Sequence, residues 1–149
     1  MIFTPSRIES DAVPSSVSVS PALTLHNLGG AVLHQRDERR AAVCFADGLT
    51  LSEELRFRYG IAMNLAGMAG VAAAKGQPEH SARLFGAADA LFDAMGQVVE
   101  PGDRTEYDRN AAVARTQLGA QAFAAAWTAG RAMTMEQAIA DALEPAALP

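Results

Sequence analysis

The chain has 149 residues, enough for one domain with a core of its own. Half of its residues are hydrophobic, but only 6% are aromatic and alanine is abundant, which favours close packing of helices over β-sheets. The net charge is −5, with twelve Lys and Arg among seventeen acidic residues. Such a balance leaves no basic face to neutralise a phosphate backbone, so it argues against direct nucleic-acid binding.

Cys44 is the only cysteine. A single cysteine excludes an internal disulfide and a cysteine-based metal cluster, and we expect a small buried apolar side chain there. The sequence contains no run of about 18 apolar residues, and it does not begin with the charged-then-apolar order of a signal peptide. We therefore expect a cytoplasmic protein without a membrane segment.

Residues 1–20 contain prolines and several serines with weak apolar periodicity. Burial of such a segment cannot offset the cost of ordering it, which predicts a poorly ordered N-terminal tail over residues 1–20. The valine-serine alternation in residues 13–19 could form a short strand, an alternative that lacks a partner strand.

Residues 21–97 predict two helical hairpins, because their apolar residues recur three and four positions apart. A turn at Arg36-Asp37 separates the helices of the first hairpin, and Gly76 followed by Pro78 separates those of the second. The apolar stripes comprise Leu25, Leu28, Val32 and Leu33, then Ala42, Phe45, Leu49 and Leu51, then Leu65, Met68, Val71 and Ala72, and finally Leu84, Phe85, Ala88, Leu91, Phe92 and Met95.

The two hairpins are an internal repeat, in which Leu25 corresponds to Leu65 and Phe45 to Phe85. The tetratricopeptide period of about 34 residues is shorter than the interval from Phe45 to Phe85. We attribute the difference to an extra turn in the connection over residues 51–59.

Residues 98–149 predict C-terminal helices that pack on the repeats. A capping box of Asp103 and Glu106 is expected to open a helix that Gly119 ends. A helix over residues 121–130 would use Phe123 and Trp127 for packing, and Thr134 with Gln137 forms another capping box before a last helix.

The first hairpin resembles the tetratricopeptide motif, with Leu28-Gly29 at the close helix contact, Asp37 in the turn, Ala41 opposite and Phe45 as the large plug. Arg36 departs from this motif, because glycine is usual there. The resemblance implies an all-α fold of tetratricopeptide-like antiparallel hairpins, a right-handed α-solenoid fragment, with capping helices at the C-terminal end.

A second resemblance covers residues 70–143 through the segments GVAAAKGQPEHSARLFGAADAL and AFAAAWTAGRAMTMEQAIADAL and the intervening residues 101–107. They are similar to the C-terminal region of actinobacterial-type LuxR-family transcriptional regulators and related signalling ATPases. That similarity implies a regulatory scaffold or sensor arm and not an enzyme. The chain has neither a phosphate-binding G-x-x-x-x-G-K-[ST] loop nor a helix-turn-helix segment, so ATP hydrolysis and operator binding do not carry over.

In tetratricopeptide proteins the first helix of each hairpin lines a concave face. Ala and Gly there would let a partner helix approach closely, so we expect a partner-binding groove. An equally weighted alternative is that the chain's own C-terminal helices cover this face through Trp127 or Ile139. The predicted groove residues are Leu23, His26, Gly30, Leu33, His34, Met63, Ala66, Gly70, Ala73 and Ala74.

The histidines do not predict a metal or catalytic site. His26 and His34 are eight residues apart, too far for chelation from adjacent helical turns, and no acidic partner of His80 is set by spacing. Arg131 either binds a carboxylate or is a solvated arginine, and the second is slightly favoured.

The sequence therefore predicts a protein–protein interaction module without cofactors, whose partner is another protein or a neighbouring domain of a longer regulator. One alternative is a sensor with an effector pocket formed by Met63, Phe85, Phe92 and Trp127. An enzyme built on His34 and His80 is the least favoured alternative. The ends of a short array also allow self-association through apolar faces.

Overall fold

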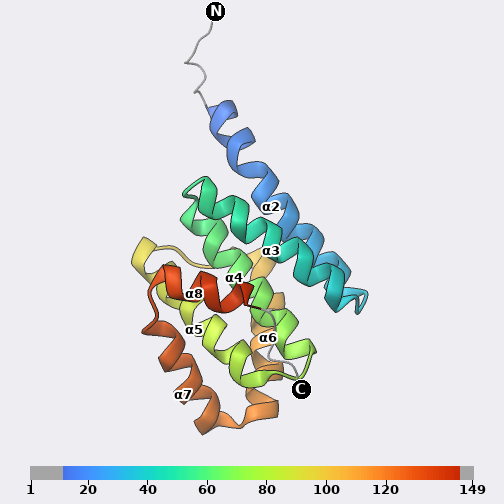
Figure 1. The fold of residues 1–149 in the computed structure, drawn as a ribbon, viewed down its shortest axis with the longest axis vertical. Coiled ribbons are helices and arrows are strands. Elements are labelled where there is room, and N and C mark those ends of the chain that lie inside the picture. Colours follow the sequence, from blue (N-terminus) through green and yellow to red (C-terminus); the bar gives the residue numbers. More distant parts are fainter. Residues whose placement is uncertain (1–11, 145–149) are drawn as a thin grey trace, which may run out of the picture.

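A computed structural model describes the backbone of residues 12–144 and the side chains of residues 21–144. The described residues form helices and no strand, which confirms the all-α prediction (Figure 1). The helices are α2 (Ala12–His34), α3 (Glu38–Glu54), α4 (Arg58–Ala74), α5 (Pro78–Met95), α6 (Pro101–Leu118), α7 (Ala120–Arg131) and α8 (Met135–Leu143).

Helix α2 begins at Ala12, so residues 12–20 are helical and the alternative of a short strand over residues 13–19 is wrong. Pro14 lies in the first turn of this helix, where backbone N–H groups have no intrahelical acceptor. Proline lacks this N–H, so no intrahelical hydrogen bond is lost there. The other part of the predicted tail, residues 1–11, lies outside the described residues. Poor order of residues 1–20 stays a prediction.

Four turns share one geometry and recur at equal intervals, at Arg36, Arg56, Gly76 and Gly96, all with positive φ. In each turn the next residue donates its N–H to the carbonyl five positions back, at 2.8 to 3.0 Å. This bond closes a Schellman motif, which ends a helix through a left-handed residue. The repeating unit is therefore one helix and its turn, and the interval from Phe45 to Phe85 spans two such units.

The connection between α3 and α4 is only residues 55–57, so the expected extra turn in residues 51–59 is wrong. The repeat is longer than the tetratricopeptide period of about 34 residues because its helices are long, since α3 and α4 have 17 residues each.

The plugs of both hairpins are buried, as predicted. Phe45 lies against Gly29 and Gly67, and a Cβ added to Gly29 would be 2.7 Å from Phe45 Cε1, so the small residue sets how closely α2 approaches α3. Phe85 packs against Tyr107 of α6 with ring centroids 5.0 Å apart. Leu28 is 45% exposed, so its assignment to the buried stripe is corrected.

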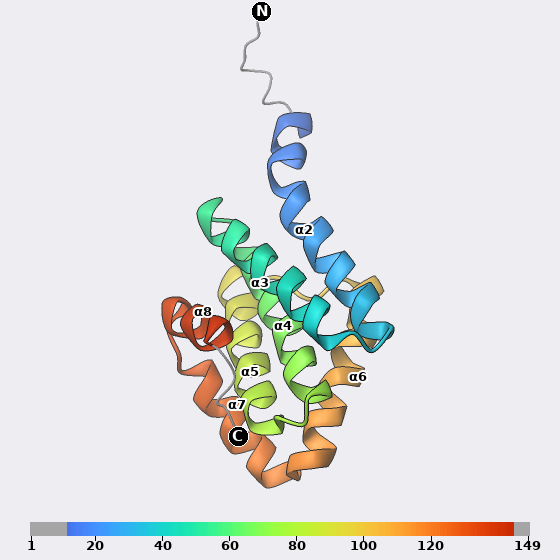
Figure 2. The same ribbon diagram turned by 45° about the vertical axis from the view of Figure 1, so that its right-hand side comes forward.

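Helices α4 and α5 form the centre, with α6 on one side and α7 and α8 on the other (Figure 2). Helix α7 lies so close to α5 that a Cβ on Gly86 would meet the carbonyl of Trp127, and one on Gly130 would meet the carbonyl of Arg83. Glycine is required at both positions by this approach of two backbones.

Helix α8 begins with the predicted capping box, in which Thr134 accepts from the Gln137 N–H while the Gln137 side chain accepts from the Thr134 N–H. The capping box predicted at Asp103 and Glu106 is wrong. Helix α6 begins two residues before Asp103, because the φ angle of Pro101 is fixed near the helical value and favours proline at the first helical position.

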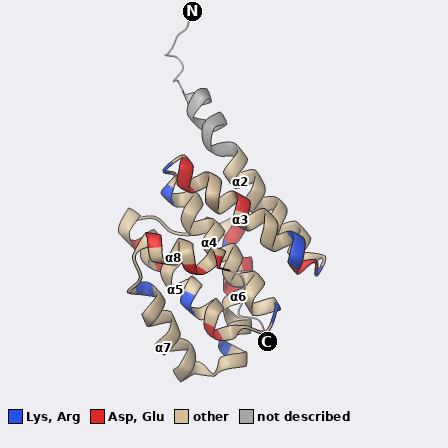
Figure 3. Cartoon of the chain, viewed as in Figure 1, with Lys and Arg blue, Asp and Glu red and all other residues tan. Residues whose placement is uncertain are grey.

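Lys and Arg are interspersed with Asp and Glu over the described helices in this view (Figure 3). Within residues 12–144, no helix has the length and apolar character that crossing a bilayer requires.

Candidate functional site: a groove between α2 and α6

Helices α2, α4 and α6 bring the predicted groove residues together, but with unequal exposure. Helix α6 packs along α4 and buries the residues that α4 contributes, whereas α2 keeps its own accessible. The α4 residues Met63, Ala66, Gly70 and Ala73 are buried, the α2 residues Leu23, His26, Gly30 and Leu33 are half-buried, and His34 and Ala74 are exposed.

The chain's own C-terminal part covers one side of the groove, although not through the residues expected. Asn110 of α6 lies over Gly70, where an added Cβ would be 2.8 Å from Asn110 Nδ2. Ile139 packs in the core of α4, α5 and α8, and Trp127 packs where α7 meets α5. The alternative of self-covering is therefore correct in part, with α6 as the covering helix.

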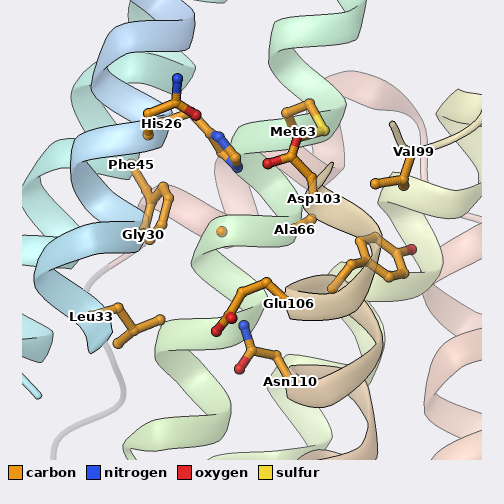
Figure 4. A pocket seen from close by; sticks show the side chains of 13 residues that line it. His26, Gly30, Leu33, Phe45, Met63, Ala66, Val99, Asp103, Glu106 and Asn110 are labelled. Carbon is orange, nitrogen blue, oxygen red and sulfur yellow. The ribbon is translucent and has the colours of Figure 1, made fainter. Parts of the chain in front are cut away.

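Between α2 and α6 a pocket of about 120 Å³ is open to solvent above α4. Its walls are mainly apolar, and polar side chains surround its mouth. In Figure 4, Asp103, Glu106 and Asn110 extend from α6 toward α2, and His26 faces Asp103 from the other wall. The lining residues are His26, Asn27, Gly30, Leu33, Phe45, Met63, Ala66, Gly67, Val99, Asp103, Glu106, Tyr107 and Asn110.

A wider hollow of about 510 Å³ lies next to the pocket. Leu33, Glu106 and Asn110 line both spaces and lie between them, so the pocket and the hollow are neighbours along α4, and the His34–Glu106 pair crosses from α2 to α6 between them. From Met63 to Ala74 the groove floor is roughly 17 Å long at the helical rise per residue, about five residues of an extended chain.

Carboxylates dominate the charge at the pocket mouth. Glu106 is neutralised on the protein, since His34 Nε2 and Arg109 Nη1 each lie 2.9 Å from its Oε1. Asp103 forms no ion pair with any other residue of the described part. Within the described part of the chain, the charge of Asp103 is therefore not compensated by an ion pair.

Burial lowers the pKa of His26 from its ordinary value of 6.5, although the nearby Asp103 acts in the opposite direction. His26 also lies against Phe45, with ring centroids 5.6 Å apart. The imidazole is consequently neutral near pH 7. Burial likewise raises the pKa of the Tyr107 phenol, which stays protonated.

The other candidate residues lie elsewhere. Arg131 binds the carboxylates of Asp89 and Asp93 on α5, which supports the less favoured of its two interpretations. His80 Nε2 lies 3.3 Å from the Asp141 carbonyl oxygen, and Arg83 holds the Asp141 carboxylate with two hydrogen bonds. These contacts attach α7 and α8 to α5.

The four residues of the effector pocket suggested by the sequence pack in one hydrophobic cluster. Of these four residues only Met63 lines the pocket between α2 and α6. Phe85 and Phe92 are buried core residues, and Trp127 lies between α5 and α7. Among the described residues, no group of three His, Cys, Asp or Glu side chains is placed to hold a metal ion.

Sequence reasoning did not find Asp103, Tyr107 and Asn110 as groove residues. Their spacing over positions three and four apart places them on one face of a helix, which is the signal that could have found them. Comparison with protein family models, curated proteins and solved structures found no match.

Proposed function

We propose that this chain is a protein-interaction module whose groove between α2 and α6 binds a segment of a partner protein or of a neighbouring domain. The observation that carries the proposal is the position of the pocket and the wider hollow next to each other along α4, because a polypeptide can occupy two neighbouring hollows. Small residues such as Gly30 leave room for the bound backbone, since a Cβ there would meet nothing within 4 Å.

The regulatory context is proposed from the resemblance to the C-terminal region of LuxR-family regulators and related signalling ATPases. The stack of equally spaced helix-turn units, with Phe45 and Phe85 at equivalent positions, supports a tetratricopeptide-like arrangement. In such a role the module would be a scaffold for signal transduction in the cytoplasm.

The test is selection of peptides from a random display library on the full chain, followed by binding measurements on two variants. Gly30→Trp fills the pocket without a clash, because the space beside Gly30 is open. Ala31→Trp is the matched control, since Ala31 is exposed on the same helix and outside the pocket.

The proposal expects selected peptides to lose binding on Gly30→Trp and to keep it on Ala31→Trp. Absence of any peptide with this difference would contradict the proposal. Both variants are checked for unchanged helical circular dichroism.

A small-molecule sensor is the second candidate, and the apolar pocket of about 120 Å³ favours it. An apolar cavity of about 150 Å³ binds benzene, so a ligand of that size would fit, whereas drug-sized ligands occupy about 300 Å³ or more. A thermal-shift screen of metabolites discriminates the two, because a true effector stabilises the protein without a peptide and loses this effect in Gly30→Trp.

A further inference from the structure

We infer that the bound segment carries one apolar side chain next to a lysine or arginine, so that the apolar group fills the pocket and the cation pairs with Asp103. The inference rests on the proposed function and specifies the chemistry of the partner. It is drawn from two features that meet at the same place, an apolar cavity and a carboxylate at its mouth that has no ion-pair partner among the described residues.

The pocket fits one side chain and no more. Phe45 and Met63 form apolar walls and the backbone of Gly30 leaves the entrance open. A volume of about 120 Å³ matches a Leu, Met or Phe side chain in size. Burying such a side chain provides about 1.5 to 3 kcal/mol, enough to anchor a peptide at one point.

The charge at the mouth selects a cation. Glu106 already has His34 and Arg109 at 2.9 Å, so the negative charge left over belongs to Asp103. His26, which faces Asp103, is neutral near pH 7 because burial lowers its pKa. A partner carboxylate would therefore be repelled at this point, and an ammonium or guanidinium group would be attracted.

The occupant is a polypeptide and not a free organic amine, because a second hollow lies next to the pocket. Beyond Leu33 and Asn110 this wider hollow lies between Ala74 and Gln117, and a single amine in the pocket would leave it empty. A peptide anchored at the pocket passes over the His34–Glu106 pair into this hollow, where Leu33, Val113 and the exposed Ala74 contact it.

The test uses the peptides selected on the full chain, each synthesised with a fluorophore and titrated by fluorescence anisotropy. Selected peptides whose binding is lost in Gly30→Trp are expected to share Leu, Met or Phe followed or preceded by Lys or Arg. Asp103→Asn is expected to weaken their binding about fivefold to tenfold, which corresponds to about 1 to 1.4 kcal/mol.

Asp108→Asn is the matched control, because Asp108 is an exposed carboxylate of the same helix outside the groove and its partner is Arg104. It should leave the dissociation constant unchanged. The charge-swapped pair, Asp103→Lys with a peptide whose basic residue is replaced by Glu, should restore part of the lost affinity.

The possible failures can be told apart. Peptides that depend on Gly30 but show no basic residue, or that bind Asp103→Asn as tightly as the native chain, would overturn this inference and leave the proposed function standing. If no selected peptide loses binding in Gly30→Trp, both the proposed function and this inference are overturned. Stabilisation of the protein by hexylammonium as strong as that by the peptides would overturn the polypeptide occupant in favour of a small amine.

Discussion

The two hairpins follow the same plan, but only the second is enclosed. Thirteen residues of α4 are buried, because α2, α3, α5, α6 and α8 all pack against this helix. In α2, from residue 21 onward, only Ala22, Gly29 and Val32 are buried. A repeat therefore fixes where helices cross, while the neighbours of each helix decide which of its faces remains open for binding. The groove lies where the less enclosed α2 meets the covered α4.

The largest expected difference between the hairpins concerns their plugs. Phe85→Ala should destabilise the fold by about 4 kcal/mol, because the ring fills space between α4, α5 and Tyr107 that cannot collapse. Phe45→Ala should cost less, about 3 kcal/mol, since the new cavity opens into the pocket and water can enter it. Urea denaturation of both variants measures this order, and equal losses would contradict the unequal enclosure of the hairpins.

Neighbouring glycines of α2 sharpen the comparison within the first hairpin. Gly29→Ala should destabilise the fold by about 2 kcal/mol, because Phe45 is held against Gly67 and cannot withdraw from the added methyl group. Gly30→Ala should stabilise it by about 0.5 to 1 kcal/mol, since the methyl group meets open space and alanine favours the helix. The same urea titrations provide the measurement. A loss of stability in Gly30→Ala would show that the pocket beside it is closed.

Substitutions at the turn residues should change the stability of the fold by less, and in opposite directions in the two hairpins. Arg36 has φ 64°, so Arg36→Gly should stabilise the protein by about 1 kcal/mol by relieving a left-handed arginine. Gly76 has φ 74°, and Gly76→Arg should cost about as much. A shift of about 2 to 4 °C in melting temperature is expected for each variant, upward for the first and downward for the second. Shifts in the same direction would mean that the two turns do not share their geometry.

Sequence reasoning predicted the helices better than the surface they present. Phe45 and Phe85, and the turns at Arg36 and Gly76, follow from periodicity, because these features are local or repeat along the chain. Burial of the α4 face was one of two equally weighted alternatives, and the choice between them depends on where α6 docks. Helix α6 has few apolar residues, so its sequence pattern does not identify it as the helix that covers α4.

The groove chemistry was missed for a related reason. Asp103 and Glu106 fit a capping box by spacing, and only their position across from α2 shows that they belong to the groove. The ion pair of Arg83 with Asp141 likewise joins positions 58 residues apart, and no local rule connects them. Contacts of this kind are set by docking of helices and not by sequence spacing.

The smallest expected effect is a pH dependence that belongs to the open hairpin. The pKa of His26 is 6.5 in an unfolded chain and lower in the folded protein, because burial disfavours the charged imidazole. The unfolded chain therefore binds a proton more readily as the pH falls below about 6.5, and the free energy of unfolding decreases in the interval down to the lowered pKa. His26→Gln should remove this contribution, which urea titrations from about pH 7.5 to 5.5 would detect as a flatter profile of the free energy of unfolding against pH.

His34→Gln is the control, because it removes an exposed histidine of the same helix that pairs with Glu106. It separates the effect of burying His26 from the effect of a histidine charge near Glu106. Parallel profiles of the native chain and His26→Gln would mean that water reaches His26 freely and that the wall of the pocket is not closed at α2.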